Sequence, residues 1–247
     1  AVFTEASAGF TTRNYRNYID SESWVDHGLF NCFAKNVDAL RLSSYFLKDR
    51  GRKIEGGALW DFDRSANSTD GRDDAFNTWV GTGDATDYFT FAWWQPLFQD
   101  IEFRQLFVDQ WQKHRKTSAL STVGINGILD GFLSEFKVTD PEHPGTRDYA
   151  KWYSGQGKNL QSEVTNLKSW LASRAAWMDS QFTLPPVVLT PPGVIAAGST
   201  VSFGIPAGTT VYYRLDGQDP RLEGGGVRSG TSVYTGTPIT LNSSKMV

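Results

Sequence analysis

The chain has 247 residues and a net charge of −3, with 39% hydrophobic and 21% charged residues. This length can hold one large domain or a medium domain with a small one, and the composition excludes a disordered chain. The negative net charge gives no support to nucleic-acid binding, and no stretch approaches the ~18 apolar residues of a transmembrane segment. A single cysteine, Cys32, excludes a disulfide within the chain and is expected to be buried.

A helix is the first predicted element, over residues 20–35. Polar residues at its start, Asp20 among them, are suited to cap it. Apolar residues follow at helical spacing, namely Val25, Leu29, Cys32 and Phe33. The helix leads to an acidic residue, Asp38.

A β-hairpin is predicted next, with a first strand-like run over residues 40–48, a turn at 49–51 and a return through 54–59. Neighbouring strands lie only about 5 Å apart. Antiparallel pairing therefore brings Asp38 and Asp61, which flank the two strands, to the same edge of the hairpin.

A polar loop over residues 64–74 follows, without helical or strand periodicity. A long loop beside a candidate site is often functional. Residues 61–67 also imitate the opening of a calcium-binding EF-hand loop, with oxygen ligands at alternate positions. The rest of that motif is missing, because Ala66 and Arg72 stand where glycine and glutamate are required.

The middle of the chain is predicted to be mostly helical, with helices over residues 100–116, 121–136 and 161–181. Asp100 is suited to cap the first of these helices. Its apolar face carries Phe103, Leu106, Phe107 and Trp111. The basic cluster at residues 113–116 is expected to complement the helix dipole and to need no partner.

The composition changes at residues 183–186, where two prolines introduce glycine- and proline-rich turns between short β-rich runs. This pattern is typical of a small β-sandwich. We therefore expect a first domain over residues 1–183 and a second over 184–247.

Two carboxylates that meet across a hairpin suit phosphoryl transfer. One can orient or deprotonate an acceptor hydroxyl, and the other can hold Mg²⁺ on phosphate oxygens. The alternative is structural: Asp38 caps a turn, and Asp61 and Asp63 are solvated loop acids. The three histidines lack metal-ligand spacing with Cys32, so zinc is not expected, and P-loop and nucleophile-elbow motifs are missing.

Several short motifs occur in order within residues 1–183. They are YIDSESW (18–24), KNVD (35–38), FLKDRG (46–51), LWDFDR (59–64), DQW (109–111), LKSWL (167–171) and DSQF (179–182). In this order they resemble the CotH spore-coat kinase family. The resemblance implies an α+β, atypical protein-kinase-like fold, of which this chain supplies the mostly helical C-terminal part of the catalytic domain.

The resemblance also implies roles for three residues. Asp38 matches the catalytic aspartate, Asp61 matches the Mg²⁺-binding aspartate, and Asp63 adds a second metal contact. The implied reaction transfers the γ-phosphate of ATP to a Ser or Thr hydroxyl of a protein substrate, with Mg²⁺ or Mn²⁺ as cofactor.

Two departures from the family pattern bear on activity. The family's N-terminal part, which supplies a lysine and the wall over the phosphates, is expected to precede Ala1, so we expect this chain to be an incomplete fragment and a weak catalyst alone. Ser43 stands five residues after Asp38, where a conventional kinase has an asparagine for a second metal ion.

The tail resembles the Ig-like module that follows chitobiase- and hexosaminidase-type catalytic domains and occurs in bacterial surface proteins. The resemblance covers residues 211–221 and 234–239, and it implies an extracellular or cell-surface protein with contact to the surface or to polysaccharide through the tail. The rival hypothesis is a non-catalytic adhesion or binding protein on the same scaffold, with Trp60, Trp93 and Trp94 as its recognition face.

Overall fold

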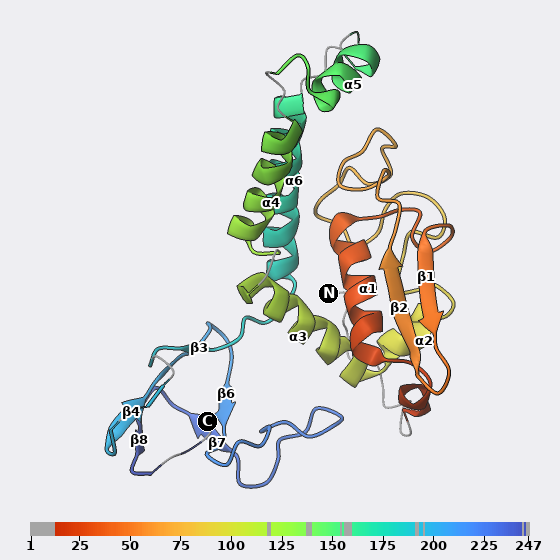
Figure 1. Cartoon of the computed structure of the whole chain (residues 1–247). Coiled ribbons are helices and arrows are strands. Elements are labelled where there is room, and N and C mark those ends of the chain that lie inside the picture. The colour runs from red at the N-terminus through yellow and green to blue at the C-terminus, as the bar shows by residue number, and fades with distance from the viewer. Residues whose placement is uncertain are drawn as a thin grey trace. The chain divides into compact units, whose positions relative to one another are not determined.

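The computed structural model describes residues 13–117, 120–136, 140–153, 155, 160–190, 193–194, 196–243 and 245. The chain forms two compact units, the first ending at Ser180 and the second beginning at Gln181 (Figure 1). The first unit mixes helices with one β-hairpin, and the second is built from short strands. No helix in the described parts of the chain is long and apolar enough to cross a membrane.

The predicted first helix is confirmed as α1 (Ser21–Ala34), which follows the short 3₁₀ helix η1 (Asn14–Asn17). The Asp20 carboxylate caps α1 by accepting a hydrogen bond from the backbone N–H of Ser23 at 2.9 Å. Lys35 ends the helix in the left-handed conformation, with φ of 55°. The buried face of α1 contains Cys32, whose burial raises the pKa of its thiol to about 12.

The predicted hairpin is also confirmed. Strands β1 (Ser44–Lys48) and β2 (Ile54–Leu59) pair antiparallel, with Ser44 opposite Leu59 and Lys48 opposite Ile54. The expected start of the first strand at Leu40 is wrong, because residues 38–43 form hydrogen-bonded turns before β1 begins.

Helix α1 packs closely on β2 (Figure 1). A Cβ atom at Gly56 would lie 2.5 Å from the carbonyl oxygen of Ser23, so only glycine allows this approach. The indole N–H of Trp24 donates to the carbonyl of Ile54 at 3.0 Å. These contacts fix the hairpin against the helix that leads to Asp38.

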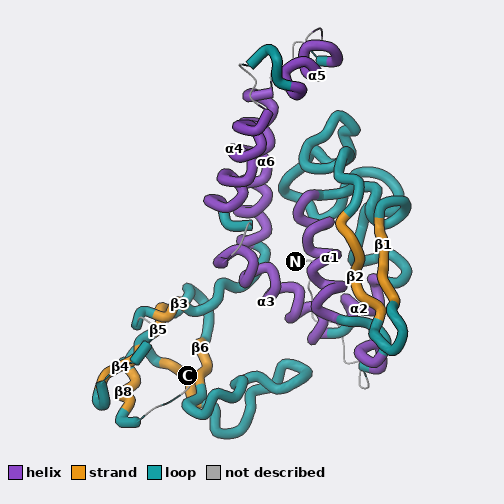
Figure 2. The backbone as a smooth tube through the Cα atoms, viewed as in Figure 1, coloured by secondary structure: helices purple, strands orange, loops and turns teal. Residues whose placement is uncertain are grey.

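A long loop segment separates β2 from the helical part of the first unit (Figure 2). The helices are α2 (Trp94–Gln99), α3 (Ile101–Thr117), α4 (Thr122–Phe136), α5 (Pro144–Trp152) and α6 (Leu160–Ser180). Helices α3, α4 and α6 match the predicted ones, whereas α2 and α5 were not predicted. The aromatic face expected for α3 is largely confirmed, because Phe103, Phe107 and Trp111 are buried.

The basic end of α3 corrects one prediction. The cluster was expected to need no partner, but two of its side chains have one. The imidazole of His114 lies 2.9 Å from the Asp26 carboxylate, and the guanidinium of Arg115 pairs with Asp179 at 2.9 Å. The cluster therefore ties α3 to α1 and to α6.

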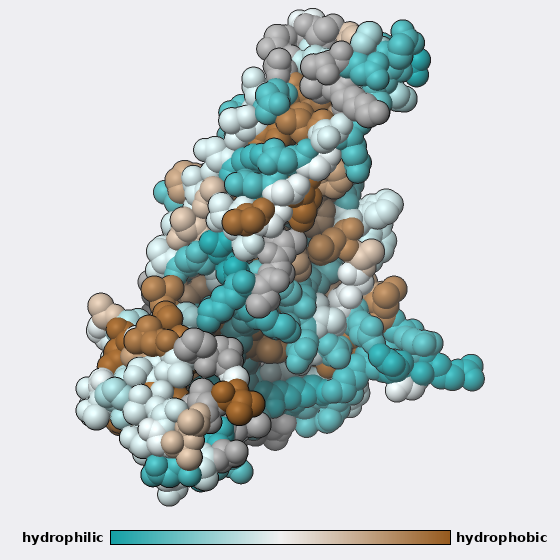
Figure 3. All heavy atoms as spheres, turned by 60° about the vertical axis from the view of Figure 1, so that its left-hand side comes forward, coloured by the Kyte–Doolittle hydropathy of each residue, from teal (hydrophilic) through white to brown (hydrophobic). Residues whose placement is uncertain are grey.

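Helix α4 packs on α6 but leaves part of its apolar face in solvent. The exposed apolar residues of this helix are Val123, Ile128, Phe132 and Phe136. Figure 3 shows hydrophobic side chains among hydrophilic ones on this face of the molecule.

The second unit confirms the β-rich pattern of the tail. Its strands are β3 (Val187–Val188), β4 (Ser199–Val201), β5 (Phe203–Gly204), β6 (Val211–Tyr213), β7 (Ser232–Tyr234) and β8 (Ile239–Leu241). They pair antiparallel as β3–β5, β4–β8 and β6–β7. Tyr234 is buried with its ring centroid 5.3 Å from that of Phe203. The described strands form three separate pairs, so an Ig-like sandwich remains a prediction.

Candidate active site

Asp38 lies in a tight turn between the end of α1 and β1. Its carbonyl oxygen accepts the backbone N–H groups of Arg41, Leu42 and Ser43 at 3.1, 2.8 and 3.2 Å. The main-chain carbonyl thus holds the turn, and the carboxylate accepts no backbone hydrogen bond within the described residues. The structural alternative, in which the Asp38 side chain caps this turn, does not describe these hydrogen bonds, whereas its second part agrees with the structure, because Asp61 and Asp63 are exposed loop residues.

The side chain of Asn36 links the two predicted acidic positions. Its Oδ1 accepts the backbone N–H of Asp38 at 3.2 Å, and its Nδ2 donates to the carbonyl of Asp61 at 3.3 Å. Asn36 itself is buried. The chain segments that carry Asp38 and Asp61 are therefore held against each other, as the hairpin pairing predicts.

Asp61 and Asp63 lie in the loop that leaves β2, and both are exposed. Asp61 has a φ of 58°, a left-handed conformation that aspartate tolerates better than most residues. The negative charge of Asp63 is the main cause that raises the pKa of Asp61, and the charge of Asp38 contributes in the same direction. Asp61 thus lies close enough to Asp63 and to Asp38 for the charge of each to act on its carboxyl.

These acids can be tested for their fit to a metal ion. Among the described residues, no group of three or more His, Cys, Asp and Glu side chains is placed to hold a metal. Magnesium bound with a nucleotide commonly uses only one or two carboxylates, with phosphate oxygens and water as the other ligands. Asp61 and Asp63 provide such a pair, and a divalent cation would relieve their mutual repulsion, so the chemistry of these two residues fits a cation such as Mg²⁺ or Mn²⁺.

Three arginine side chains surround the carboxylate of Asp38. Arg72 Nη2 and Arg41 Nη2 lie 3.1 and 3.4 Å from Oδ1, and Arg64 Nε lies 3.6 Å from Oδ2. Arg64 and Arg72 also pair with Asp70, and the hydrogen bond from Arg72 is the main cause that lowers the pKa of the Asp70 carboxyl. The candidate base is therefore held in a network of opposite charges.

A protein-family model described as "CotH kinase protein" matches residues 2–178. The chain belongs to the CotH kinase family. No curated protein and no solved structure matches it. All the acidic and arginine side chains around Asp38 lie inside the region matched by the CotH model, and the second unit lies outside it.

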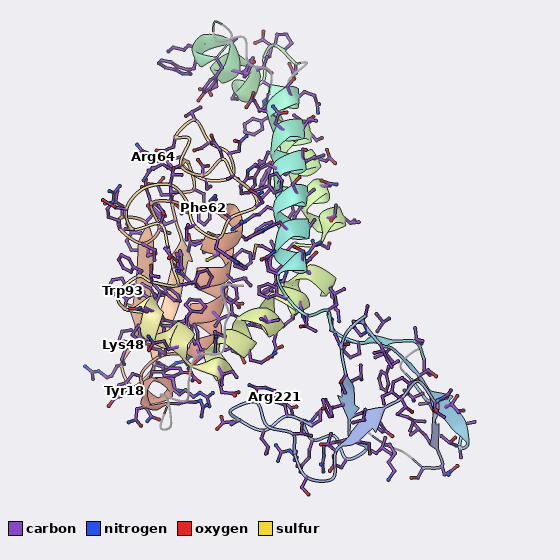
Figure 4. All side chains as sticks on the ribbon, turned by 180° about the vertical axis from the view of Figure 1, so that it is seen from behind. Tyr18, Lys48, Phe62, Arg64, Trp93 and Arg221 are labelled. Atoms are coloured by element: carbon purple, nitrogen blue, oxygen red, sulfur yellow. The ribbon has the colours of Figure 1, made fainter. Side chains whose placement is uncertain are left out.

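The polar loop of this CotH domain folds back beside Asp38. The carbonyl of Arg64 accepts the backbone N–H of Val37 at 3.4 Å, and the carbonyl of Arg72 accepts that of Thr82 at 3.0 Å. Asp73 is fully buried and accepts two hydrogen bonds from Ser68. Figure 4 shows Arg64 at the end of the hairpin away from Lys48.

The network of arginines was not predicted from the sequence. Arg72 lies 34 positions after Asp38, and nothing in the spacing of the loop indicates their contact. For Arg64 the sequence did offer an indication: it directly follows Asp63, so a position near the predicted acidic site could have been expected. Ser43, which stands where a conventional kinase has the second-metal asparagine, is buried and donates its backbone N–H to the carbonyl of Asp38.

Helix α6 closes the end of the helix that leads to Asp38. The guanidinium of Arg174 donates to the carbonyls of Cys32 at 2.6 Å, Phe33 at 3.3 Å, Phe76 at 2.7 Å and Thr78 at 2.5 Å. Burial lowers the pKa of Arg174 to about 10, so the side chain is still charged at neutral pH. A cation at the C-terminal end of a helix stabilises it, because the exposed carbonyls carry partial negative charge.

Proposed function

We propose that this chain is part of an atypical protein kinase of CotH type, which transfers the γ-phosphate of ATP to a Ser or Thr hydroxyl of a protein. The observation that carries the proposal is the placement of Asp38 beside Asp61, held by Asn36, inside a family match over residues 2–178. Membership of the family supports a kinase-like protein, and the reaction and its acceptor are the proposed part.

In the proposed reaction, Asp38 accepts the proton of the acceptor hydroxyl. The hydroxyl oxygen forms a bond to the γ-phosphorus as the bond from that phosphorus to the bridging oxygen breaks, and ADP leaves. Asp61, helped by Asp63, would hold Mg²⁺ or Mn²⁺, which when bound neutralises charge on the phosphate oxygens.

Transfer of labelled phosphate from ATP in the full-length protein tests this proposal. Asp38→Asn and Asp61→Asn are each expected to lower the rate by about 10²–10⁴-fold, because each removes a charge that the reaction needs. Asp49→Asn, at the tip of the hairpin, is the control and should leave transfer unchanged. Full activity in the Asp38 variant would contradict the proposal.

We also propose that the protein acts outside the cell or at its surface. The support is the resemblance of the tail to Ig-like modules of surface proteins. Fractionation of cells that make the protein tests this assignment, and recovery only from the cytoplasmic fraction would contradict it. Binding of the tail to a polysaccharide or to the cell surface is part of the same proposal.

A second candidate function is ligand binding without catalysis, as in an adhesion protein. Trp60 and Trp93 favour it, because 56% and 54% of their surfaces are exposed. Trp94 cannot take part in such a face, because it is only 1% exposed. Binding that survives Asp61→Asn but is lost in Trp60→Ala would favour adhesion over phosphotransfer.

A further inference from the structure

The arginines around Asp38 outnumber the carboxylates with which they form ion pairs. Arg41, Arg64 and Arg72 face two carboxylates, those of Asp38 and Asp70, in the described ion pairs. The side chains of Arg41 and Arg64 are 52% and 50% exposed, whereas those of Asp38 and Asp70 are 10% and 14% exposed. The guanidinium groups therefore lie on the solvent side of the acids.

The backbone behind these side chains is closely packed. A Cβ atom at Gly81 would lie 2.6 Å from Val37 Cγ1 and 2.9 Å from the carbonyl oxygen of Arg72. The carbonyl of Arg64 is itself hydrogen-bonded to Val37. The two loop arginines thus extend from a fixed base that also carries the Asp38 turn; the side chain of Arg64 is half exposed, and that of Arg72 is 23% exposed.

Guanidinium groups bind phosphate as they bind carboxylate, through parallel N–H donors of matching geometry. A polyphosphate chain carries more negative charge than one aspartate and competes for the same donors. Asp61 and Asp63 lie just before Arg64 in the chain, the charge of Arg64 acts on Asp61, and the two carboxylates suit a divalent cation. A polyphosphate with its bound metal ion would therefore find donors for its oxygens and carboxylates for its cation at one place.

The arginines also limit what Asp38 can do. A carboxylate has about four acceptor positions. Arg41 and Arg72 both donate to Oδ1 of Asp38, and Arg64 lies next to Oδ2. The two arginine hydrogen bonds thus use Oδ1, and an acceptor hydroxyl has to approach Asp38 at Oδ2, beside the Arg64 guanidinium.

We propose that Arg41, Arg64 and Arg72 bind the polyphosphate chain of the nucleotide, and that this binding releases Asp38 to accept a proton. Without phosphate the guanidinium groups occupy the carboxylate, and with phosphate they turn to the phosphate oxygens. This inference rests on the proposed kinase function, and it adds a specific anion site and a coupling between nucleotide and base.

Titration of the chain with inorganic tripolyphosphate, without metal, measures the anion site directly by calorimetry. Arg41→Gln and Arg64→Gln are each expected to weaken binding about tenfold, because each loses a charged donor to phosphate. Both side chains are about half exposed, so the fold should be kept. Arg52→Gln is the matched control: Arg52 is an exposed arginine at the hairpin tip, paired at i,i+3 like Arg41, and its loss should change nothing.

The decisive variant is Asp38→Asn. A neutral amide no longer competes for the guanidinium groups, so tripolyphosphate should bind several-fold more tightly than to the unchanged protein. A site that does not involve Asp38 predicts no change. Weaker or equal binding in Asp38→Asn, or equal binding in all arginine variants, would overturn the inference.

Two further measurements separate this inference from the kinase proposal. If tripolyphosphate binds as expected but no phosphate is transferred, the anion site stands and the kinase assignment fails. If phosphate is transferred and the KM for ATP is unchanged in Arg64→Gln, the kinase stands and the anion site is overturned. Binding of orthophosphate or a phosphoserine peptide as tight as that of tripolyphosphate would overturn the assignment to a nucleotide chain.

Discussion

Two arginine sites in the first unit have different partners. Arg174 is fully buried, and its described hydrogen bonds all go to backbone carbonyls. Arg41, Arg64 and Arg72 lie nearer the surface, and their described ion pairs are with carboxylates. The Arg174 guanidinium is enclosed by the carbonyls that it holds, whereas the side chains of Arg41 and Arg64 are about half exposed and also face solvent. Arg174 therefore serves structure alone, and Arg41 and Arg64 can be reached from solvent.

The largest expected effect comes from Arg174→Met. The substitution removes the hydrogen bonds to the carbonyls of Cys32, Phe33, Phe76 and Thr78, of which Cys32 keeps the Lys35 N–H as a donor. Each buried carbonyl left without a donor costs about 1–3 kcal/mol. We expect the free energy of unfolding to fall by about 3–5 kcal/mol, measured by urea denaturation. Tryptophan fluorescence reports on the first unit alone, because all nine tryptophans precede Gln181.

Arg147→Met, an exposed position on α5, is the matched control and should change the free energy of unfolding by less than about 0.5 kcal/mol. A loss below about 1 kcal/mol in Arg174→Met would show that water replaces the guanidinium, and the contrast between the two arginine sites would disappear.

An effect of intermediate size concerns pH and Cys32. The pKa of its thiol is raised from 9.0 to about 12 by burial, so between these values the unfolded chain loses a proton that the folded chain keeps. Stability must then fall as pH rises above about 9, by about 1.4 kcal/mol per unit. Cys32→Ala lacks this loss, so unfolding of both proteins at pH 8 and pH 10 should show the difference. If the free energy of unfolding changed equally with pH in both proteins, the Cys32 thiol on the buried face of α1 would have to be accessible to solvent.

The smallest effect is expected for Arg41→Gln. Exposed ion pairs contribute about 0–1 kcal/mol, and salt screens them. The free energy of unfolding should fall by about 0.5 kcal/mol at low ionic strength and by nothing measurable in 1 M salt, whereas the loss in Arg174→Met should persist. A salt-independent loss above about 1 kcal/mol would make Arg41 a structural residue.

Local patterns in the sequence predicted the parts of the site that depend on local structure. The cap at Asp20 and the apolar spacing after it indicated α1, and the turn at residues 49–51 indicated the hairpin. Pairing of the two strands then placed Asp38 near Asp61 by geometry alone. The start of β1 was misplaced, because β-like residues after Asp38 are held in turns by its carbonyl.

The side chains that complete the site could not be predicted in this way. Arg72 reaches Asp38 from 34 positions away, and Arg174 reaches Cys32 from 142 positions away. Such contacts depend on how a loop and a distant helix pack. This packing produces no repeating pattern of residues from which the contact could be predicted. Asn36 belongs to the KNVD motif, but its hydrogen bonds to the backbone at Asp38 and at Asp61 form only once the turn has folded.

The cap that Arg174 places on α1 has a consequence for synthesis on the ribosome. Chains grow at about 5–20 residues per second, so Arg174 follows Cys32 by about 7–28 s. Throughout that interval, water must solvate the carbonyls at the end of α1. A nascent chain that stops before α6 already contains Asp38, Asn36 and Asp61, yet lacks the guanidinium that closes the helix ahead of them. The helix that leads to the candidate site therefore receives its guanidinium cap only after α6 has been synthesised.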